Sequence, residues 1–224
     1  MSLKVLNKNQ LRRMPDYLTV IKDMKGRGYK YVSCQELADI LNLNKEQVKK
    51  DIAVVSTKSG IPNKGRDITQ LIMDIENVLG YDDIHNAILV GVGDLGKALL
   101  KYQGFREYGL KIVGAFDSSE EVIGQVINDI RIRDVKTLPK VFRDYNAKIG
   151  IICVPKDHAQ EIVNVLIEAG ALAIWNFAPI TLVSKKHGVI ISNTNMATSL
   201  SVLSHQLYLM KKKNAGKLEQ NRVK

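Results

Sequence analysis

VGVGDLG, residues 90–96, contains three glycines that fit the pattern G-x-G-x-x-G. That pattern is a weak signal alone, so the neighbouring segments must decide. An apolar run at 87–90 precedes the turn, a helical stripe at 95–102 follows it, and a second apolar run at 111–116 ends at Asp117. This order of strand, glycine turn, helix, strand and acid is typical of a dinucleotide-binding βαβ unit.

The residue types of this turn each have a physical role. Gly91 allows a sharp reversal of the chain, Gly93 lets backbone N–H groups approach a pyrophosphate, and Gly96 lets the helix pack on the strand. Asp117, 21 residues past Gly96, can accept hydrogen bonds from an adenosine ribose, and no arginine follows it to bind a 2′-phosphate. The sequence therefore predicts NAD(H) rather than NADP(H) as cofactor. The predicted contacts here are Gly91, Val92, Gly93, Asp94, Leu95, Gly96, Asp117 and Ser118.

Strands and helices continue to alternate after this unit. Apolar runs at 149–154, 172–174 and 189–191 predict strands, and the segment 157–169 predicts a helix that ends at Gly170. Together they indicate an α/β fold with a small doubly wound parallel sheet.

A long helix over 196–213 follows the last predicted strand. Its apolar stripe needs a surface to bury against, and a partner subunit could supply one. The stripe consists of Leu200, Leu203, Leu207 and Met210.

Composition fits an ordinary globular protein of one large or two modest domains. The chain has 224 residues, 45% of them hydrophobic and 25% charged. No apolar run approaches the ~18 residues needed to cross a bilayer, and the basic start lacks the apolar segment of a secretion signal, so we expect a cytoplasmic protein with no membrane partner. Cys34 and Cys153 have no metal-binding or disulfide spacing and are expected to be reduced, buried thiols.

The net charge of +10 lies at the two ends of the chain. Residues 1–66 hold 14 Lys and Arg against 6 Asp and Glu, and the tail from 211 holds 6 against 1. Residues 67–210 hold 13 against 16 and are mildly acidic. The first 66 residues are therefore the expected contact for a polyanion, whereas the tail is expected to be a solvated end.

The N-terminal block predicts a run of short helices. Apolar spacing over 9–24 indicates an amphipathic helix, Ser33 and Glu36 form a capping box for a second, and Asn44 and Gln47 form a similar pair for a third. The second and third helices, joined by a tight turn, resemble a helix-turn-helix motif. Its outward, DNA-facing side chains are Lys45, Gln47, Lys49 and Lys50.

The segment 57–68 combines turn residues with cations and would suit a wing along the DNA backbone, with a helix over 69–79 after it. The alternative is a three-helix bundle with a charged surface. The predicted backbone contacts in the wing are Lys58, Lys64 and Arg66.

Catalysis is poorly supported. The four histidines lack a placed carboxylate or nucleophile, and little chain remains for a substrate-holding domain, so the sequence indicates a sensor and not an enzyme. Three alternatives stay open: a small NAD-dependent oxidoreductase, a CoA-binding module with an accessory basic domain, and a DNA-binding protein whose nucleotide site only supports a dimer.

Four motifs together make the chain resemble the Rex family of redox-sensing bacterial repressors: QVKKDI at 47–52, VGVGDLG at 90–96, CVP at 153–155 and NFAP at 176–179. The resemblance implies a homodimer whose winged-helix domains bind operator DNA and whose Rossmann domains bind NADH or NAD⁺. It also implies a C-terminal helix swapped onto the partner and release of DNA by NADH. The implied domains are residues 1–80, 81–194 and 195–224.

The resemblance also assigns residues. Arg13 and Tyr102 match two members of an Arg, Tyr, Asp set that couples the domains in this family. The positions that match the nicotinamide end of the site are Val154, Pro155, Asn176, Phe177, Ala178 and Pro179.

The chain departs from the family pattern at several places. The wing keeps only part of the family's glycine and basic pattern, and Lys49 replaces an arginine, which loses the two-pronged contact with guanine. Ser192 stands at the position of the coupling Asp, and Val202 stands at that of an aromatic residue near nicotinamide. These departures predict an altered operator and weaker redox coupling.

Overall fold

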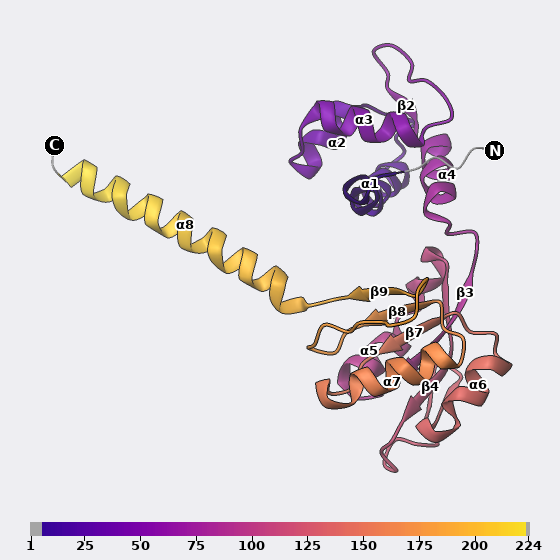
Figure 1. Cartoon of the computed structure of the whole chain (residues 1–224). Helices are drawn as coiled ribbons and strands as arrows, with labels where there is room; N and C mark the ends of the chain where they lie inside the picture. The colour runs from indigo at the N-terminus through magenta and orange to yellow at the C-terminus, as the bar shows by residue number, and fades with distance from the viewer. Residues whose placement is uncertain (1–5, 223–224) are drawn as a thin grey trace. The chain divides into compact units, whose positions relative to one another are not determined.

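The computed structural model describes residues 6–222, except for the side chains at 196, 199 and 213–222 (Figure 1). The chain forms two compact units. The first runs to Ile84 and includes Glu107–Gly109, and the second contains His85–Arg106 and the chain from Leu110 onward.

Residues 6–84 of the first unit contain four α-helices and a two-stranded antiparallel sheet. The apolar faces of the helices pack together, with Met14, Tyr17, Ile52 and Ile75 fully buried among them. This arrangement confirms the predicted helices and the helix-turn-helix. The elements are α1 (Lys8–Gly26), β1 (Tyr31–Val32), α2 (Cys34–Leu41), α3 (Lys45–Val55), β2 (Arg66–Asp67) and α4 (Ile68–Leu79).

The helices of the first unit begin where side chains accept their first backbone N–H groups. Ser33 and Glu36 form the predicted capping box of α2. Asn44 accepts from the N–H groups of Glu46 and Gln47, but the side chain of Gln47 does not return to the cap. Asn7 and Asp67 cap α1 and α4 in the same way.

The wing, between α3 and α4, is pinned to the small sheet. Ile61 and Gly65 exchange backbone hydrogen bonds at 2.7 and 3.0 Å. Gly65 has φ 92°, and a Cβ there would lie 2.2 Å from the carbonyl oxygen of Val32. The guanidinium of Arg66 donates to the carbonyl of Lys58. The loop is therefore braced by its own backbone and by β1.

The second unit is a seven-stranded sheet in the order β5-β6-β4-β3-β7-β8-β9, parallel except for the β5/β6 pair. The chain passes outward from β3 to β4 and β6, then returns to β7 on the other side of β3. This reversal is the topological switch point of a doubly wound fold, where ligands bind at the carboxyl ends of the strands. The strands are β3 (His85–Val90), β4 (Leu110–Asp117), β5 (Val126–Ile127), β6 (Ile130–Asp134), β7 (Ile149–Ile152), β8 (Ala173–Asn176) and β9 (Ile190–Asn193).

Helices cover both faces of this sheet (Figure 1). One buried cluster joins Phe116 and Ile152 to Phe142 of α6 and Val163 of α7, and another joins Leu89 of β3 to the α5 side. The helices are α5 (Asp94–Lys101), α6 (Leu138–Asp144) and α7 (Lys156–Glu168), with 3-10 helices η1 (Gln103–Tyr108) and η2 (Val135–Thr137).

The last helix, α8 (Met196–Arg222), is longer than the predicted 196–213 and leaves its apolar side chains exposed. Leu200 is 62% exposed and Leu203 61%. Large exposed apolar surfaces of this kind are often interaction sites. The basic side chains beyond Lys212 lie outside the described part. None of the helices in residues 6–222 is long and apolar enough to cross a membrane.

Both cysteines are free. They were expected to be buried, but each is only half-buried. Burial raises the pKa of both thiols, that of Cys153 to about 12. Both therefore stay protonated at neutral pH.

Candidate functional site

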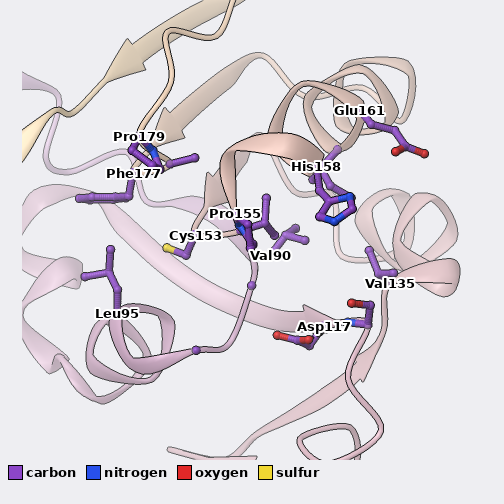
Figure 2. Close-up of a pocket in the computed structure, with 16 residues that line it drawn as sticks. Val90, Leu95, Asp117, Val135, Cys153, Pro155, His158, Glu161, Phe177 and Pro179 are labelled. Carbon is purple, nitrogen blue, oxygen red and sulfur yellow. Dashed lines mark hydrogen bonds between the residues drawn. The ribbon is translucent and has the colours of Figure 1, made fainter.

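A cavity of about 660 Å³ lies at the switch point of the second unit (Figure 2). Four strand ends form it, because β3, β4, β7 and β8 each end at this edge of the sheet. Figure 2 shows Asp117 and Val135 at one end of the cavity and Phe177 and Pro179 at the other. The predicted cofactor residues that line it are Gly91, Gly93, Leu95, Asp117, Ser118, Val154, Pro155, Phe177, Ala178 and Pro179.

The three glycines of the turn are required for different reasons. A Cβ on Gly91, whose φ is 96°, would lie 2.6 Å from the carbonyl carbon of Cys153, and a Cβ on Gly96 would lie 2.0 Å from the carbonyl oxygen of Gly91. The fold itself therefore requires these two glycines. A Cβ on Gly93 would meet nothing within 4 Å. Nothing in the described protein requires a glycine there, which points to the close approach of a ligand.

Asp117 holds the turn from the end of β4. One carboxylate oxygen accepts from the N–H of Val92 at 2.6 Å, and the other accepts from those of Ser118 at 2.7 Å and Ser119 at 2.9 Å. A carboxylate offers about four acceptor positions, so about one remains for a ligand hydroxyl. Asp117 therefore both shapes the turn and can bind a ribose.

Two helices point their N-termini at this cavity without a side-chain cap. The N-cap of α5 is Gly93 and that of α7 is Pro155, and neither supplies a side-chain hydrogen bond to its helix. Both residues line the cavity. Uncapped N–H groups and the positive end of the helix dipole favour an anion.

Some predicted cofactor residues lie outside the cavity lining. The side chain of Val92 is in the core, Asp94 is exposed, and Gly96 lies in the helix-to-turn contact. Asn176, 1% exposed, accepts from the N–H of Ala178 at 2.8 Å and donates to the carbonyl of Ile180 at 2.7 Å. Asn176 therefore shapes the loop that carries Phe177.

Other residues that line the cavity were not predicted from the sequence. Val90, Val135, Cys153 and Ile162 add apolar or weakly polar walls, and α7 contributes His158 and Glu161. The sequence signal for the α7 residues was their position in the first turns of the helix that follows a central strand. Among the described residues, no group of three His, Cys, Asp or Glu side chains is placed to hold a metal ion.

An aromatic chain, also missed, connects the cavity wall with the surface. The ring of Trp175 lies 4.7 Å from that of Phe177 and 5.6 Å from that of Phe105. Phe105 contacts Tyr102, the predicted coupling residue, at 4.8 Å. The indole N–H of Trp175 donates to the hydroxyl of Thr194 at 3.0 Å, just before α8.

The predicted DNA-facing residues all lie on the first unit. Lys45, Lys49 and Lys50 are exposed on α3, whereas Gln47, which was also expected to point outward, is half-buried. Lys58 and Lys64 are exposed on the wing, whereas Arg66 is half-buried against the carbonyl of Lys58. The structure therefore presents five exposed lysines on α3 and the wing.

The predicted coupling residue Arg13 is engaged inside the first unit. Its guanidinium donates to both oxygens of Asp51, at 2.7 and 3.0 Å, and the hydroxyl of Tyr17 donates to Asp51 at 2.8 Å. Burial acts to raise the pKa of Asp51, which is 2% exposed, but the hydrogen bonds from Arg13 and Tyr17 outweigh it and hold that pKa below its ordinary value. Tyr102 follows α5 and is 53% exposed.

Comparison with known proteins assigns the family. Residues 8–53 match a family described as putative DNA-binding protein N-terminus, and residues 82–180 match the CoA binding domain. The redox-sensing transcriptional repressor Rex of Clostridioides difficile (strain 630) is 37% identical over 201 residues, which cover 90% of this chain and 93% of that protein. Rex of Bacteroides thetaiotaomicron is 35% identical and covers 88% of this chain and 89% of that protein.

Similarity to solved structures supports the same family. RSP, a Rex-family repressor, has a TM-score of 0.83 at 30% identity, covering 94% of this chain and 99% of its own. RSP in complex with β-NAD⁺ and operator DNA has the same TM-score and identity, covering 94% of this chain and 98% of its own. RSP in complex with β-NADH also has the same TM-score and identity, covering 93% of this chain and 98% of its own. The chain belongs to the Rex family of redox-sensing transcriptional repressors.

Proposed function

We propose that this protein is a homodimeric repressor that binds operator DNA and is released by NADH. Residues 1–80 bind DNA, residues 81–194 bind NAD(H), and residues 195–224 cover the partner subunit. The proposal is supported by the relatives solved with NAD⁺, NADH and operator DNA. The exposed leucines of α8 support the dimer, because a partner subunit would bury them.

One feature carries the nucleotide assignment: the open position beside Gly93 between two uncapped helix N-termini. A dinucleotide diphosphate fits it, because backbone N–H groups and helix dipoles stabilise an anion. Asp117 accepts from the adenosine ribose and repels the 2′-phosphate of NADP(H). Nicotinamide supplies the redox signal, because its ring is cationic when oxidised and neutral when reduced.

The apolar end of the cavity suits the nicotinamide. Phe177 and Pro179 lie at this end, and Val154, Pro155 and Ala178 also line the cavity (Figure 2). An apolar wall stabilises a neutral ring better than a cationic one, because it does not replace the solvation of the charge. This difference favours NADH over NAD⁺. The bound nucleotide acts as a signal and not as a hydride donor to a substrate.

DNA binding uses α3 and the wing. Lys49 and Lys50 face the groove, and Lys58, Lys64 and Arg66 face the phosphates. Lysine contacts release condensed counterions, so operator affinity falls steeply with salt. Gln47 and Lys45 complete the surface of α3.

The response to NADH is smaller than the family pattern implies. A ligand shifts an equilibrium only by its difference in affinity for the two states. Ser192, exposed on β9, offers no carboxylate to Arg13, and Val202, exposed on α8, offers no aromatic ring to nicotinamide. Tyr102 and Arg13 remain the coupling residues.

Fluorescence anisotropy of a labelled operator tests this function. The operator is a duplex selected by the protein from random-sequence DNA. NADH should weaken binding more than NAD⁺ does, NADPH should act only at much higher concentration, and NADH should not be consumed. Gly93→Ala should bind the duplex and respond to NADH only weakly. Wild-type affinity unchanged by saturating NADH would contradict the proposal.

A further inference from the structure

One guanidinium spans two successive turns of α3. Arg13, on α1, donates from Nε and Nη2 to Asp51 at 2.7 and 3.0 Å. The same Nε, at 3.1 Å, and Nη1, at 3.0 Å, face the amide oxygen of Gln47, one turn earlier on the helix. The opposite amide orientation would set the N–H groups of Gln47 against those of Arg13. The guanidinium therefore fixes which way the amide points.

This contact turns the oxygen of Gln47 toward the guanidinium. Nη1 donates to that oxygen at 3.0 Å, and the single hydrogen of Nε, which donates to Asp51 at 2.7 Å, is shared with it at 3.1 Å. The two N–H groups of the amide are not used by Arg13. Gln47 therefore meets a third molecule mainly as a donor.

Buried hydrogen bonds fix the positions of Asp51 and Arg13. Asp51 is 2% exposed, and the hydroxyl of Tyr17 donates to it at 2.8 Å, so the carboxylate cannot turn away without leaving buried groups unpaired. Arg13 is fixed by both oxygens of Asp51. The orientation of Gln47 is consequently built into the packing of α1 on α3.

Gln47 lies beside the surface that α3 presents. It lines an open hollow of about 550 Å³ together with Asn44, Glu46 and Lys50, all exposed. A molecule lying along α3 would meet the amide of Gln47 next to the ammonium of Lys50. Gln47 and Lys50 then both present donors on this side of the helix.

We infer that Gln47 reads a base edge that carries only acceptors. This inference rests on the proposed binding of DNA through α3. A free glutamine pairs with adenine through both its oxygen and its nitrogen, contacting N6 and N7. With its oxygen turned toward Arg13, Gln47 selects guanine N7 or O6, or thymine O4. Adenine, whose exocyclic amine is a donor, is disfavoured at that position.

Selection from random duplex DNA, followed by affinity measurements on every single-base variant of the selected duplex, tests the inference. Wild type, Gln47→Ala and Gln47→Glu are compared. Gln35→Ala, an exposed glutamine of α2 that donates to Asp39, is the matched control and should select the wild-type sequence. Circular dichroism and thermal unfolding confirm that each variant is folded.

At one base pair per half-site, wild type should prefer guanine or thymine by about 5- to 10-fold, the range of a base contact. Gln47→Ala should reduce this preference to within about 2-fold. Gln47→Glu keeps the contact with Arg13 but has no N–H group, so it should disfavour the same base and favour cytosine, whose N4 is a donor.

Three results would overturn the inference. The first is an adenine preference at the position that Gln47→Ala relaxes. The second is an equal loss of affinity for all sequences in Gln47→Ala, which would make Gln47 a phosphate contact. The third is an unchanged profile in Gln47→Ala. Failure of wild type to select any sequence would instead contradict the proposed function, and the inference would fall with it.

Discussion

The two units treat the N-termini of their helices differently. In the first unit, Asn7, Ser33, Asn44 and Asp67 each accept N–H groups at the start of one helix. In the second unit, α5 and α7 begin at the cavity without a side-chain cap. The free N–H groups of a helix need a partner in either case. Each cap of the first unit accepts one or two of these groups, whereas α5 and α7 leave theirs to a ligand.

Substitutions at two glycines of the turn before α5 separate what the fold requires from what the ligand requires. Gly96→Ala places a Cβ 2.0 Å from a backbone oxygen and should lower the free energy of unfolding by about 3 kcal/mol or more. Gly93→Ala meets nothing within 4 Å and should cost less than about 1 kcal/mol. It should nevertheless weaken NADH by more than about tenfold, or about 1.4 kcal/mol.

Chemical unfolding measures the stability of both variants, and titration with NADH measures their affinity for the nucleotide. If Gly93→Ala bound NADH as wild type does, the open position beside Gly93 would not be the diphosphate site.

The first unit should show the opposite behaviour, a large effect on stability that NADH does not change. Asp51→Asn leaves Arg13 and Tyr17 poorly paired and should lower the free energy of unfolding by about 2–4 kcal/mol. Because the pKa of Asp51 is lowered in the folded state, its contribution is complete above the ordinary carboxyl pKa and is lost as the pH falls through the lowered one.

The difference in unfolding free energy between wild type and Asp51→Asn should therefore be largest above about pH 5 and shrink below about pH 4. Urea unfolding at pH 7, 5, 4 and 3 measures it. A difference independent of pH would mean that the charge of Asp51 contributes nothing.

Asp117 serves both the fold and the ligand. Asp117→Ala should weaken NADH by about 1.5–3 kcal/mol, the loss of a charge-assisted hydrogen bond. Calorimetry should also show that wild type binds NAD(H) more tightly than NADP(H). Equal affinity for the two cofactors would remove the role given to this carboxylate.

The smallest effects should come from single lysines of the first unit. Lys64→Ala should weaken binding to all DNA sequences alike and flatten the dependence of log affinity on log salt by about 1. Lys49→Ala should in addition relax base preference. Titrations at four salt concentrations separate the two, and a slope that neither change alters would argue against DNA contact by α3 and the wing.

Local signals explain how much the sequence revealed. The capping box of Ser33 and Glu36 and the glycine turn are complete within a few residues, so α2 and the β3-to-α5 turn were predicted within one or two positions. Strands β1 and β2 have two residues each and pair across about 35 residues, which leaves no periodicity to detect.

Site residues were predicted only where a local motif contained them. His158 and Glu161 reach the cavity because α7 follows a central strand, and Trp175 matters because Phe105 and Phe177 meet it in the folded chain. The pair of Arg13 and Asp51 joins residues 38 apart. Such contacts depend on tertiary packing, which spacing along one sequence does not encode.

The most direct test of the account is the reciprocity between its two units. If NADH weakens operator binding by some factor, operator must weaken NADH binding by the same factor. NADH affinity can be followed by energy transfer from Trp175, the chain's single tryptophan, whose ring lies 4.7 Å from that of Phe177 in the cavity wall. We expect equal factors, toward the lower end of the range of about 5- to 150-fold typical of allosteric coupling. An NADH affinity that saturating operator leaves unchanged would contradict it.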